Sequence, residues 1–493
     1  MEEVDLESNL QLSRKDACNQ DLIGKIKEAG VVGAGGAGFP AHVKVSGRAD
    51  VVIANGAECE PLLEVDKIVM QNFPKFVLKG LKTVMKLSGA KRGVLYLKGK
   101  NVGRAKRLIE LIEGEKLDIS VFEVEDFYPA GDEQQMVYEV TGKVVPVGGI
   151  PLDVGAIVIN VTSLLNIARA LDGKAVTHRM VTVAGEVKRS VTLEVPVGTP
   201  IGRLVEFAGG VQDGFVAILG GPLMGSVTDD WSTPVTKTLS GVIVLRDDHR
   251  LVKMKTRDMS LDIKRAKSVC CQCNFCSELC PRNLLGLNLE PHKVMRSVGY
   301  GNSNAVQDGN RVFGCCDCGI CTYFACNMGL SPSKMVSGIK AGLLEKGIRA
   351  KGVELRGVSD AREVRKVPTK RLISRIGLTD YVGEAEFFKD VFKVDRVKIL
   401  LKQHVGVAAN AVVKVGDVVK VGDVVGRVED GKLGANVHAS IDGRVVEASE
   451  QMVEIGCADL DCKSGKQKHL LDKTLERESL HSYLGRKEGS NKL

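Results

Sequence analysis

The sequence predicts a multidomain α/β and β protein, and three observations support this class. Short apolar strands alternate with amphipathic helices up to about residue 175. Ten of the fourteen cysteines fall between Cys270 and Cys326, and a Val- and Gly-rich half-repeat follows residue 394. A chain of 493 residues is long enough for three or more such domains. The expected units are a flexible tail (1–20), an α/β domain (21–175), a small β domain (176–250), a ferredoxin-like domain (255–345), a connector (346–393), a barrel-sandwich hybrid domain (394–456) and a second flexible tail (457–493).

Composition and charge exclude several classes of function. The net charge of +8 is spread along the chain, and aromatic residues make up only 4%. Because the basic segments lack the interleaved aromatic residues of nucleic-acid-binding proteins, we expect no nucleic-acid partner. No window approaches the roughly eighteen consecutive apolar residues of a membrane-spanning helix, so no membrane span is expected. The acidic, polar N-terminus is unlike a signal peptide, which predicts a reduced, cytoplasmic protein.

Two cysteine runs have the spacing of iron–sulfur ligands. The first is Cys270, Cys273, Cys276 and Cys280 followed by Pro281, and the second is Cys315, Cys318, Cys321 and Cys326. The first run matches the C-x2-C-x2-C-x3-C-P pattern of bacterial two-cluster ferredoxins, in which the fourth cysteine binds the other cluster. We therefore expect two [4Fe-4S] clusters, one held by Cys270, Cys273, Cys276 and Cys326 and the other by Cys315, Cys318, Cys321 and Cys280.

Zinc and disulfide bonds explain these cysteines less well. Structural zinc uses two C-x2-C pairs and would leave four thiols over, while disulfides need an oxidising compartment and are usual in short secreted chains. Cys271 and Cys316 are expected to be surplus thiols beside the ligands. Cys326 departs from the usual three-residue spacing, so a labile cluster is expected to be the one that it completes.

A glycine-rich loop lies between the first expected helix and the first expected strand. The helix is Asp21 to Ala29, the loop runs from Val31 to Pro40, and the strand is Val51 to Ala54. The loop contains G-x-G-x-x-G, but a dinucleotide-binding fold places that pattern after a strand and before a helix. Here a helix comes first, which disfavours that fold. The glycines still leave backbone amides bare for an anionic or planar ligand, and a flavin phosphate suits such a loop.

Polar side chains follow two of the expected strands. Asn55, Glu58 and Glu60 follow the first strand, and Asn160 and Ser163 follow a later one. Ligands of open α/β sheets bind at the carboxyl ends of strands, so these residues predict a binding site. The alternative is an ordinary turn followed by a solvated helix start.

These motifs together resemble the FMN- and NADH-binding module of the 51 kDa subunit of respiratory complex I. Residues 24–70 are closer still to the C subunit of Rnf complexes and to the cobalamin reductase of propanediol-utilisation microcompartments. The resemblance implies that FMN is held by Gly33, Gly35, Gly36, Gly38, Lys44, Asn55, Asn160 and Ser163, that Glu58 and Glu60 contact flavin and nicotinamide as the catalytic pair, and that Glu133 belongs to the cofactor pocket. Complex I relatives carry Asp at the position of Ala57, and their later Gly-Glu-Glu motif is Gly131-Asp132-Glu133 here.

The two β-rich segments resemble accessory domains of the same families. Residues 180–245 are similar to the SLBB domain, a β-grasp-like module, with 220–225 expected as tight turns rather than as a ligand loop. The tripeptide at 415–417 repeats at 421–423, which is typical of a barrel-sandwich hybrid. Lys432 has the position of a lipoyl lysine, but the usual sequence of a modified tip is missing, so an unmodified domain is expected. Its C-terminal position favours the cobalamin reductase over the Rnf protein.

The parts together predict a soluble NADH-dependent flavin and iron–sulfur oxidoreductase. FMN converts a hydride into single electrons, and iron–sulfur clusters carry those electrons onward. The resemblance implies a corrinoid acceptor, an ATP:corrinoid adenosyltransferase and microcompartment shell proteins as partners, and a bacterial microcompartment as the location. Two alternatives stay open: an Rnf C-type electron-input protein serving a ferredoxin, a membrane complex or a dedicated reductase, and a non-catalytic cluster-binding scaffold.

Overall fold

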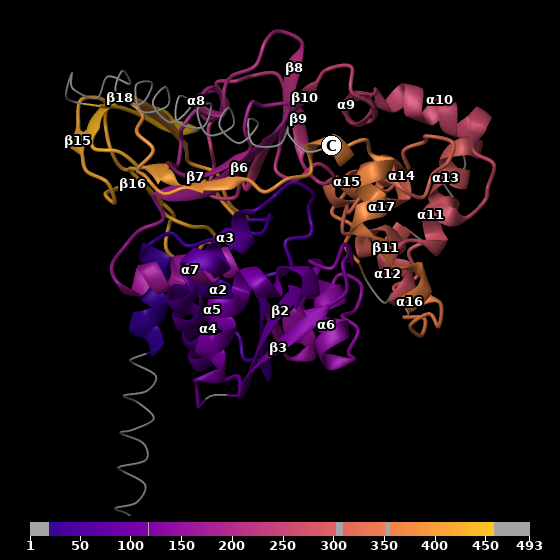
Figure 1. Ribbon diagram of the computed structural model, residues 1–493, viewed down its shortest axis with the longest axis horizontal. Coiled ribbons are helices and arrows are strands. Elements are labelled where there is room, and N and C mark those ends of the chain that lie inside the picture. Colours follow the sequence, from indigo (N-terminus) through magenta and orange to yellow (C-terminus); the bar gives the residue numbers. More distant parts are fainter. Residues whose placement is uncertain (1–18, 117, 302–308, 351–354, 458–493) are drawn as a thin grey trace, which may run out of the picture.

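The computed structural model describes residues 19–116, 118–301, 309–350 and 355–457 (Figure 1). The two expected tails therefore lie almost entirely outside the described residues, and so do Cys18 and Cys462. Within the described ranges, no helix combines the length and the apolar character needed to cross a bilayer.

The first domain is a parallel sheet with helices on both faces. Its elements are a helix over 19–28, α2 (Ala41–Val45), β1 (Val51–Asn55), α3 (Val65–Asn72), α4 (Pro74–Ser88), β2 (Arg92–Lys98), α5 (Val102–Glu113), β3 (Ile119–Val124), α6 (Glu133–Thr141), β5 (Ala156–Asn160) and α7 (Val161–Leu171). The strand order is β3-β2-β1-β5. In β1, Val52 and Ala54 face the core under α3, α4 and α7, whereas Val51 and Ile53 face α6. Burial on both faces explains why these strands are nearly continuous apolar runs.

The order of elements in this domain positions the polar strand ends. The glycine loop lies between the first helix and α2, before β1, which is the order expected from the sequence. β1 and β5 are parallel neighbours, and Asn55 is the register partner of Asn160. Because both strands end at these residues, two amide side chains emerge side by side at one edge of the sheet.

The second domain is built on a six-stranded sheet. Its elements are β6 (His178–Gly185), β7 (Val191–Pro196), α8 (Ile201–Phe207), β8 (Phe215–Leu219), β9 (Ser226–Thr228) and β10 (Gly241–Arg246). The sixth strand, β12 (Glu386–Phe388), comes from the expected connector and pairs in parallel with β7. The connector is therefore part of the sheet rather than a link alone.

The C-terminal domain consists of two small sheets that share a core with the second domain. Its strands are β13 (Arg396–Leu400), β14 (Asn410–Ala411), β15 (Val418–Val419), β16 (Val424–Arg427), β17 (Val437–His438), β18 (Gly443–Ala448) and β19 (Met452–Gly456). The repeated tripeptide builds the same turn twice: Asp417 accepts a hydrogen bond from the Lys414 amide at 2.7 Å, and Asp423 accepts one from the Lys420 amide at 2.8 Å. Lys432 is exposed and pairs with Glu429.

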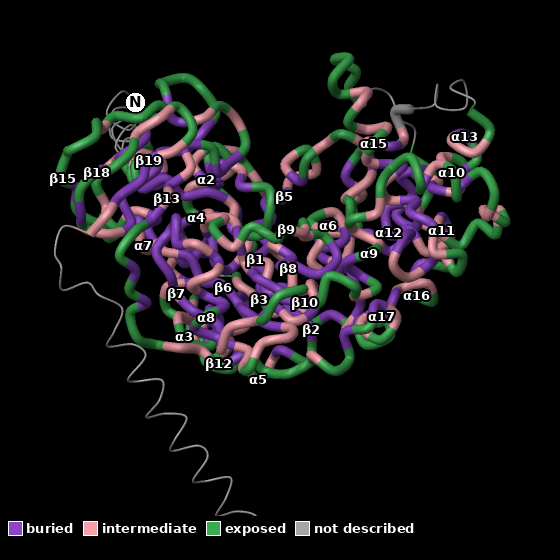
Figure 2. The backbone as a smooth tube through the Cα atoms, turned by 90° about the horizontal axis from the view of Figure 1, so that it is seen from above, coloured by how far each residue is buried: buried purple, intermediate pink, exposed green. Residues whose placement is uncertain are grey.

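The cysteine-rich region is a set of short helices beside the two sheets (Figure 1). They are α9 (Arg250–Thr256), α10 (Met259–Val269), α11 (Phe275–Glu278), α12 (Pro281–Leu284), α13 (Pro291–Tyr300), α14 (Ile320–Tyr323) and α15 (Pro332–Glu345). After them come α16 (Arg362–Arg365), β11 (Val367–Pro368) and α17 (Thr369–Arg375). β11 pairs with β4 (Phe127–Tyr128) of the first domain, which fixes the cysteine-rich region to that domain. Figure 2 shows buried backbone both in β1, β6 and β10 and beside α11 and α12.

Candidate flavin and iron–sulfur sites

A cavity of about 550 Å³ lies where the glycine loop meets the carboxyl ends of β1 and β5. This volume is typical of small-molecule sites, which span about 300 to 1,000 Å³. Every residue that the sequence assigned to the flavin pocket lines this cavity, namely Gly33, Gly35, Gly36, Gly38, Lys44, Asn55, Glu58, Glu60, Glu133, Asn160 and Ser163. The other domains complete the wall with Arg179, Met224, Ser240, Arg282 and three cysteines.

The glycine loop is held in place by all three of its neighbours. Within the loop, the Gly33 amide donates to the Phe39 carbonyl at 2.9 Å. The Ala34 amide donates to Ser163 Oγ at 2.8 Å, which connects the loop to the first turn of α7. On the other side, the Val405 amide of the C-terminal domain donates to the Gly38 carbonyl at 3.1 Å. Gly38 has φ +69°, and an added Cβ would lie 3.1 Å from the backbone of the C-terminal domain, so this position requires glycine.

The amide side chains at the strand ends organise the floor of the cavity. Asn160 caps α7 by accepting from the Thr162 amide at 2.8 Å, and its Nδ2 donates to Asp66 at 2.7 Å. Asp66 also accepts from the Thr162 hydroxyl at 3.0 Å. The sequence analysis did not single out Asp66, although its position in the first turn of α3, just after the acidic turn, was a usable signal.

The two acidic residues predicted to be catalytic have different environments. Glu58 is half-buried, with φ +34°, and accepts from the Asp66 amide at 3.3 Å. Burial, reinforced by the nearby Asp66 carboxyl, raises the pKa of Glu58 to about 8. A Glu58 carboxyl that keeps its proton at neutral pH can donate a hydrogen bond to a ligand in the cavity.

Glu60 is held by the second domain. Its carboxylate accepts hydrogen bonds from the backbone amides of Leu223 at 2.9 Å and Met224 at 3.0 Å. Gly221 makes this contact possible, because a Cβ there would overlap the Glu60 side chain. The expectation that residues 220–225 are turns alone was incomplete, since two amides of this segment bind Glu60 and Met224 lines the cavity. Burial raises the pKa of Glu60, and those two amides oppose the rise.

Lys44 and Glu133, both expected to contact cofactor, form an ion pair of 2.7 Å at the wall of the cavity. Their side chains are 23% and 47% exposed, so a ligand can approach both groups without first uncovering them.

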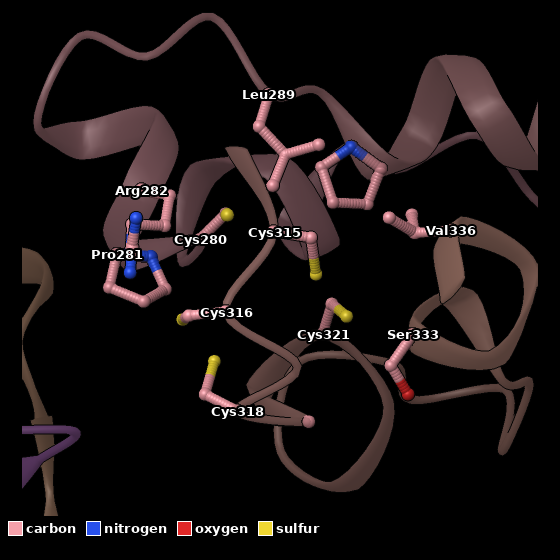
Figure 3. A pocket seen from close by; sticks show the side chains of 12 residues that line it. Cys280, Pro281, Arg282, Leu289, Cys315, Cys316, Cys318, Cys321, Ser333 and Val336 are labelled. Atoms are coloured by element: carbon pink, nitrogen blue, oxygen red, sulfur yellow. The ribbon is translucent and has the colours of Figure 1, made fainter. Parts of the chain in front are cut away.

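The cysteines gather around two smaller cavities. Cys280, Cys315, Cys318 and Cys321 surround the first, with their side chains directed to a common space (Figure 3). Cys270, Cys273, Cys276 and Cys326 line the second, together with Cys271. The residue types at these cavities are those of [4Fe-4S] sites, since each offers four thiols around one enclosed space. Among the described residues, no three His, Cys, Asp or Glu side chains have the arrangement of a single-ion site.

Both cysteine runs bend in the same way. Gln272 and Asn274 have φ of +54° and +65°, and the corresponding Asp317 and Gly319 have +55° and +73°. These left-handed residues fold each C-x2-C segment into a loop with its sulfurs on one side. In the second run the Asp317 amide lies 3.4 Å from Cys315 Sγ, so a backbone donor faces this sulfur atom.

The flavin cavity and the first cysteine cavity share a wall. Arg282, Cys315, Cys316 and Cys318 line both spaces. Arg282 forms an ion pair of 2.6 Å with Asp132, the cap of α6, and also binds the Cys316 thiol. Arg282, Asp132 and Cys316 were not predicted to have this role, because only the fold brings α6 and α12 together.

Comparisons with known proteins agree with this arrangement. Four family descriptions match successive parts of the chain: the Nuo51 FMN-binding domain (26–169), the SLBB domain (180–226), a 4Fe-4S dicluster domain (269–331) and the RnfC barrel sandwich hybrid domain (384–462). Together with the site, they define an electron-transfer oxidoreductase with an FMN-binding domain and an iron–sulfur domain. The expected fold class, with its four kinds of domain, is confirmed.

The chain belongs to the PduS cobalamin reductase family. It is 38% identical to the cobalamin reductase PduS of Citrobacter freundii over 441 residues, which cover 88% of this chain and 96% of that protein. It is also 38% identical to the Salmonella typhimurium protein of the same name over 436 residues (87% and 95%). The RnfC-type component of the Na⁺-translocating ferredoxin:NAD⁺ oxidoreductase complex of Acetobacterium woodii is 32% identical over 291 residues (57% and 62%).

A solved structure of an air-oxidised NAD⁺-reducing [NiFe]-hydrogenase is also similar to this chain. The two are 18% identical, and the match covers 73% of this chain and 66% of that one with a TM-score of 0.44.

Proposed function

We propose that this protein is an NADH-dependent reductase that passes electrons through FMN and two [4Fe-4S] clusters to a corrinoid, and so supports the regeneration of coenzyme B12. The family relatives are named cobalamin reductases, which supports the corrinoid as acceptor. When bound, FMN would accept a hydride as an electron pair and release the electrons singly to the clusters.

The observation that carries this proposal is the wall shared by the flavin cavity and the first cysteine cavity. Because Cys315 and Cys318 line both spaces, a flavin and a cluster bound there would be separated by little more than these side chains. Such proximity is what an electron relay needs, and a scaffold that only binds clusters has no use for it.

The ligand sets that we propose are crossed between the two runs. Cys280 would complete the cluster of Cys315, Cys318 and Cys321, next to the flavin cavity. Cys326 would complete the cluster of Cys270, Cys273 and Cys276, where Cys271 and Cys273 are exposed and electrons can leave. The electrons would thus enter at the buried cluster and exit at the surface one.

The chain's own residues would prepare the cavity for hydride transfer. Glu58, protonated below about pH 8, can hold a proton toward the ligand, while Glu60 fixes the second domain against the site. Lys44 and Glu133 offer one cationic and one anionic group to flavin and nicotinamide nucleotide. The glycine loop lets a ligand approach the backbone closely.

The test is anaerobic reconstitution with FMN and iron–sulfide, followed by stepwise additions. We expect NADH to bleach the flavin absorbance and reduce the clusters, and cob(II)alamin to be consumed when a corrinoid adenosyltransferase and ATP are present. Clusters that stay oxidised after NADH is added to the fully loaded protein would refute the electron-input role.

An Rnf C-type role is the second candidate, and it is favoured by the hybrid domain and by the similarity to the Acetobacterium woodii protein. That role predicts fast reduction of a ferredoxin or viologen by NADH and no corrinoid turnover. We further propose an adenosyltransferase and shell proteins as partners in a bacterial microcompartment, which co-purification from cells that express the shell would test.

A further inference from the structure

Arg179 stands out among the buried charged residues because one of its nitrogen atoms is unused. It lies on β6 of the second domain, is only 3% exposed, and lines the flavin cavity. Its Nε donates to the Leu239 carbonyl at 2.8 Å, and its Nη2 donates to the Ala34 carbonyl at 2.9 Å. Among the described residues, Nη1 has no hydrogen-bond partner, although it is buried.

The nearby acidic residues do not account for Arg179. Asp66 lies close enough to influence it, but both Asp66 oxygens already accept hydrogen bonds from Asn160 and Thr162, and within the described part of the chain no ion pair joins Asp66 to Arg179. A buried donor on a cationic group is costly to leave unsatisfied. The two backbone carbonyls also fix the plane of the guanidinium before any ligand arrives, so the free edge is preorganised.

The groups beside Arg179 favour an anion. Ala34 connects it to α7, because the Ala34 carbonyl accepts from Arg179 while the Ala34 amide donates to Ser163 Oγ. Ser163 lies in the first turn of α7, an eleven-residue helix whose N-terminus carries partial positive charge. Since Ser163 Oγ accepts from Ala34, its own hydroxyl proton is available to the cavity.

We infer that Arg179, Ser163 and the N-terminus of α7 bind the phosphate monoester of the flavin, with the Arg179 Nη1 edge donating to a phosphate oxygen. This inference rests on the FMN part of the proposed function and adds a residue from outside the matched FMN-binding segment of 26–169. It makes the second domain a contributor to the flavin site, so that the protein selects FMN over riboflavin through a contact between two domains.

The test compares two flavins on the cluster-containing, flavin-depleted protein by quenching of flavin fluorescence. Arg179→Gln is expected to raise the Kd for FMN about 10- to 100-fold, the range for a lost charged hydrogen bond, and to change the Kd for riboflavin less than about 3-fold. Arg203→Gln, an exposed position on α8 of the same domain, is the control and is expected to leave both values unchanged. An equal loss of affinity for both flavins would overturn the inference, as would an unchanged preference.

A second measurement uses the wild-type protein, in case Arg179→Gln does not fold. The wild type is expected to bind FMN at least about 10-fold more tightly than riboflavin, and inorganic phosphate is expected to raise the melting temperature of the flavin-depleted form. Equal affinities for the two flavins would overturn the inference. A protein that passes these tests but reduces no corrinoid would refute the proposed acceptor and leave the role of Arg179 intact.

Discussion

At the residue scale, the contact between Gly221 and Glu60 gives a sharp prediction. A Cβ at residue 221 would overlap the Glu60 carboxylate and push it away from the Leu223 and Met224 amides. We expect Gly221→Ala to destabilise the protein by about 1–3 kcal/mol, the usual cost of overpacking. Denaturant unfolding measures the effect.

A double-mutant cycle tests the cause of that loss. In a Glu60→Ala background the carboxylate is gone, so adding Ala at 221 should cost less than about 0.5 kcal/mol. Gly103→Ala is the matched control, since no atom lies within 4 Å of its added Cβ in α5, and it should be neutral or slightly stabilising. A cost at 221 that persists without Glu60 would contradict the proposed contact.

Glu58 predicts how stability depends on pH before flavin binds. In the unfolded chain this carboxyl ionises near its usual pKa of 4.5, whereas the folded protein keeps the proton until about pH 8. Between these values the folded state holds the extra proton, so stability falls as pH rises, by at most ~1.4 kcal/mol per pH unit. Glu58→Gln should flatten this slope in thermal unfolding of the flavin-free protein, while Glu113→Gln, an exposed carboxyl, should not. An unchanged slope in Glu58→Gln would assign the dependence to another group.

The residues that the sequence analysis missed share one property, which is that their role depends on distant partners. Arg179 reaches the glycine loop from the next domain, and Arg282 reaches Asp132 from the cysteine-rich region. No local pattern marks such residues. The glycine loop and the strand-end residues were predictable because spacing and strand position are visible in the sequence itself.

At the element scale, α12 and α14 determine how the two cysteine runs are paired. Cys280 begins α12 beside Cys315, although it belongs to the first run. We expect Cys280→Ser and Cys315→Ser each to remove one cluster, about four iron atoms, and the double variant to remove no more. Cys280→Ser combined with Cys270→Ser should remove both clusters. Iron analysis and electron paramagnetic resonance give the readout.

The control for this experiment is Cys316→Ser, which is expected to keep both clusters because the crossed assignment leaves Cys316 without a ligand role. If Cys280→Ser with Cys270→Ser retained one cluster, the two runs would each bind their own cluster without crossing.

The elements themselves were predicted unevenly. β1, β5 and α15 follow the expected apolar runs within a residue or two, and the half-repeat folds into two equivalent turns. β11 and β12 were not expected, because strands of two or three residues have no periodicity of their own and form only where an existing sheet offers an edge. The connector was therefore assigned correctly as a segment that returns to the body, without the strands that attach it.

At the scale of the whole molecule, Lys237 joins three domains at one buried point. It belongs to the second domain, is 2% exposed, and donates to the Gly30 carbonyl at 2.8 Å and to the Asn436 carbonyl at 2.7 Å. Burial lowers the pKa of Lys237 to about 7. A neutral amine has two N–H donors, and these match the two carbonyl acceptors. Near this point the C-terminal domain also binds the Gly38 carbonyl, so the junction supports the flavin loop.

The titration of Lys237 predicts that the domains hold together better at higher pH. The unfolded chain keeps this proton up to about pH 10.5 and the folded protein only to about pH 7, so stability rises with pH between these values and is lost as pH falls through 7. Lys237→Met should abolish that rise and, by leaving two buried carbonyls unpaired, cost about 2–4 kcal/mol at pH 9. Lys420→Met, at an exposed turn, should do neither. Because Lys237 sits between the domains rather than in the flavin cavity, a Lys237→Met protein that melts at the same temperature as the wild type at pH 9 would mean that the three domains are held together by their shared apolar core alone.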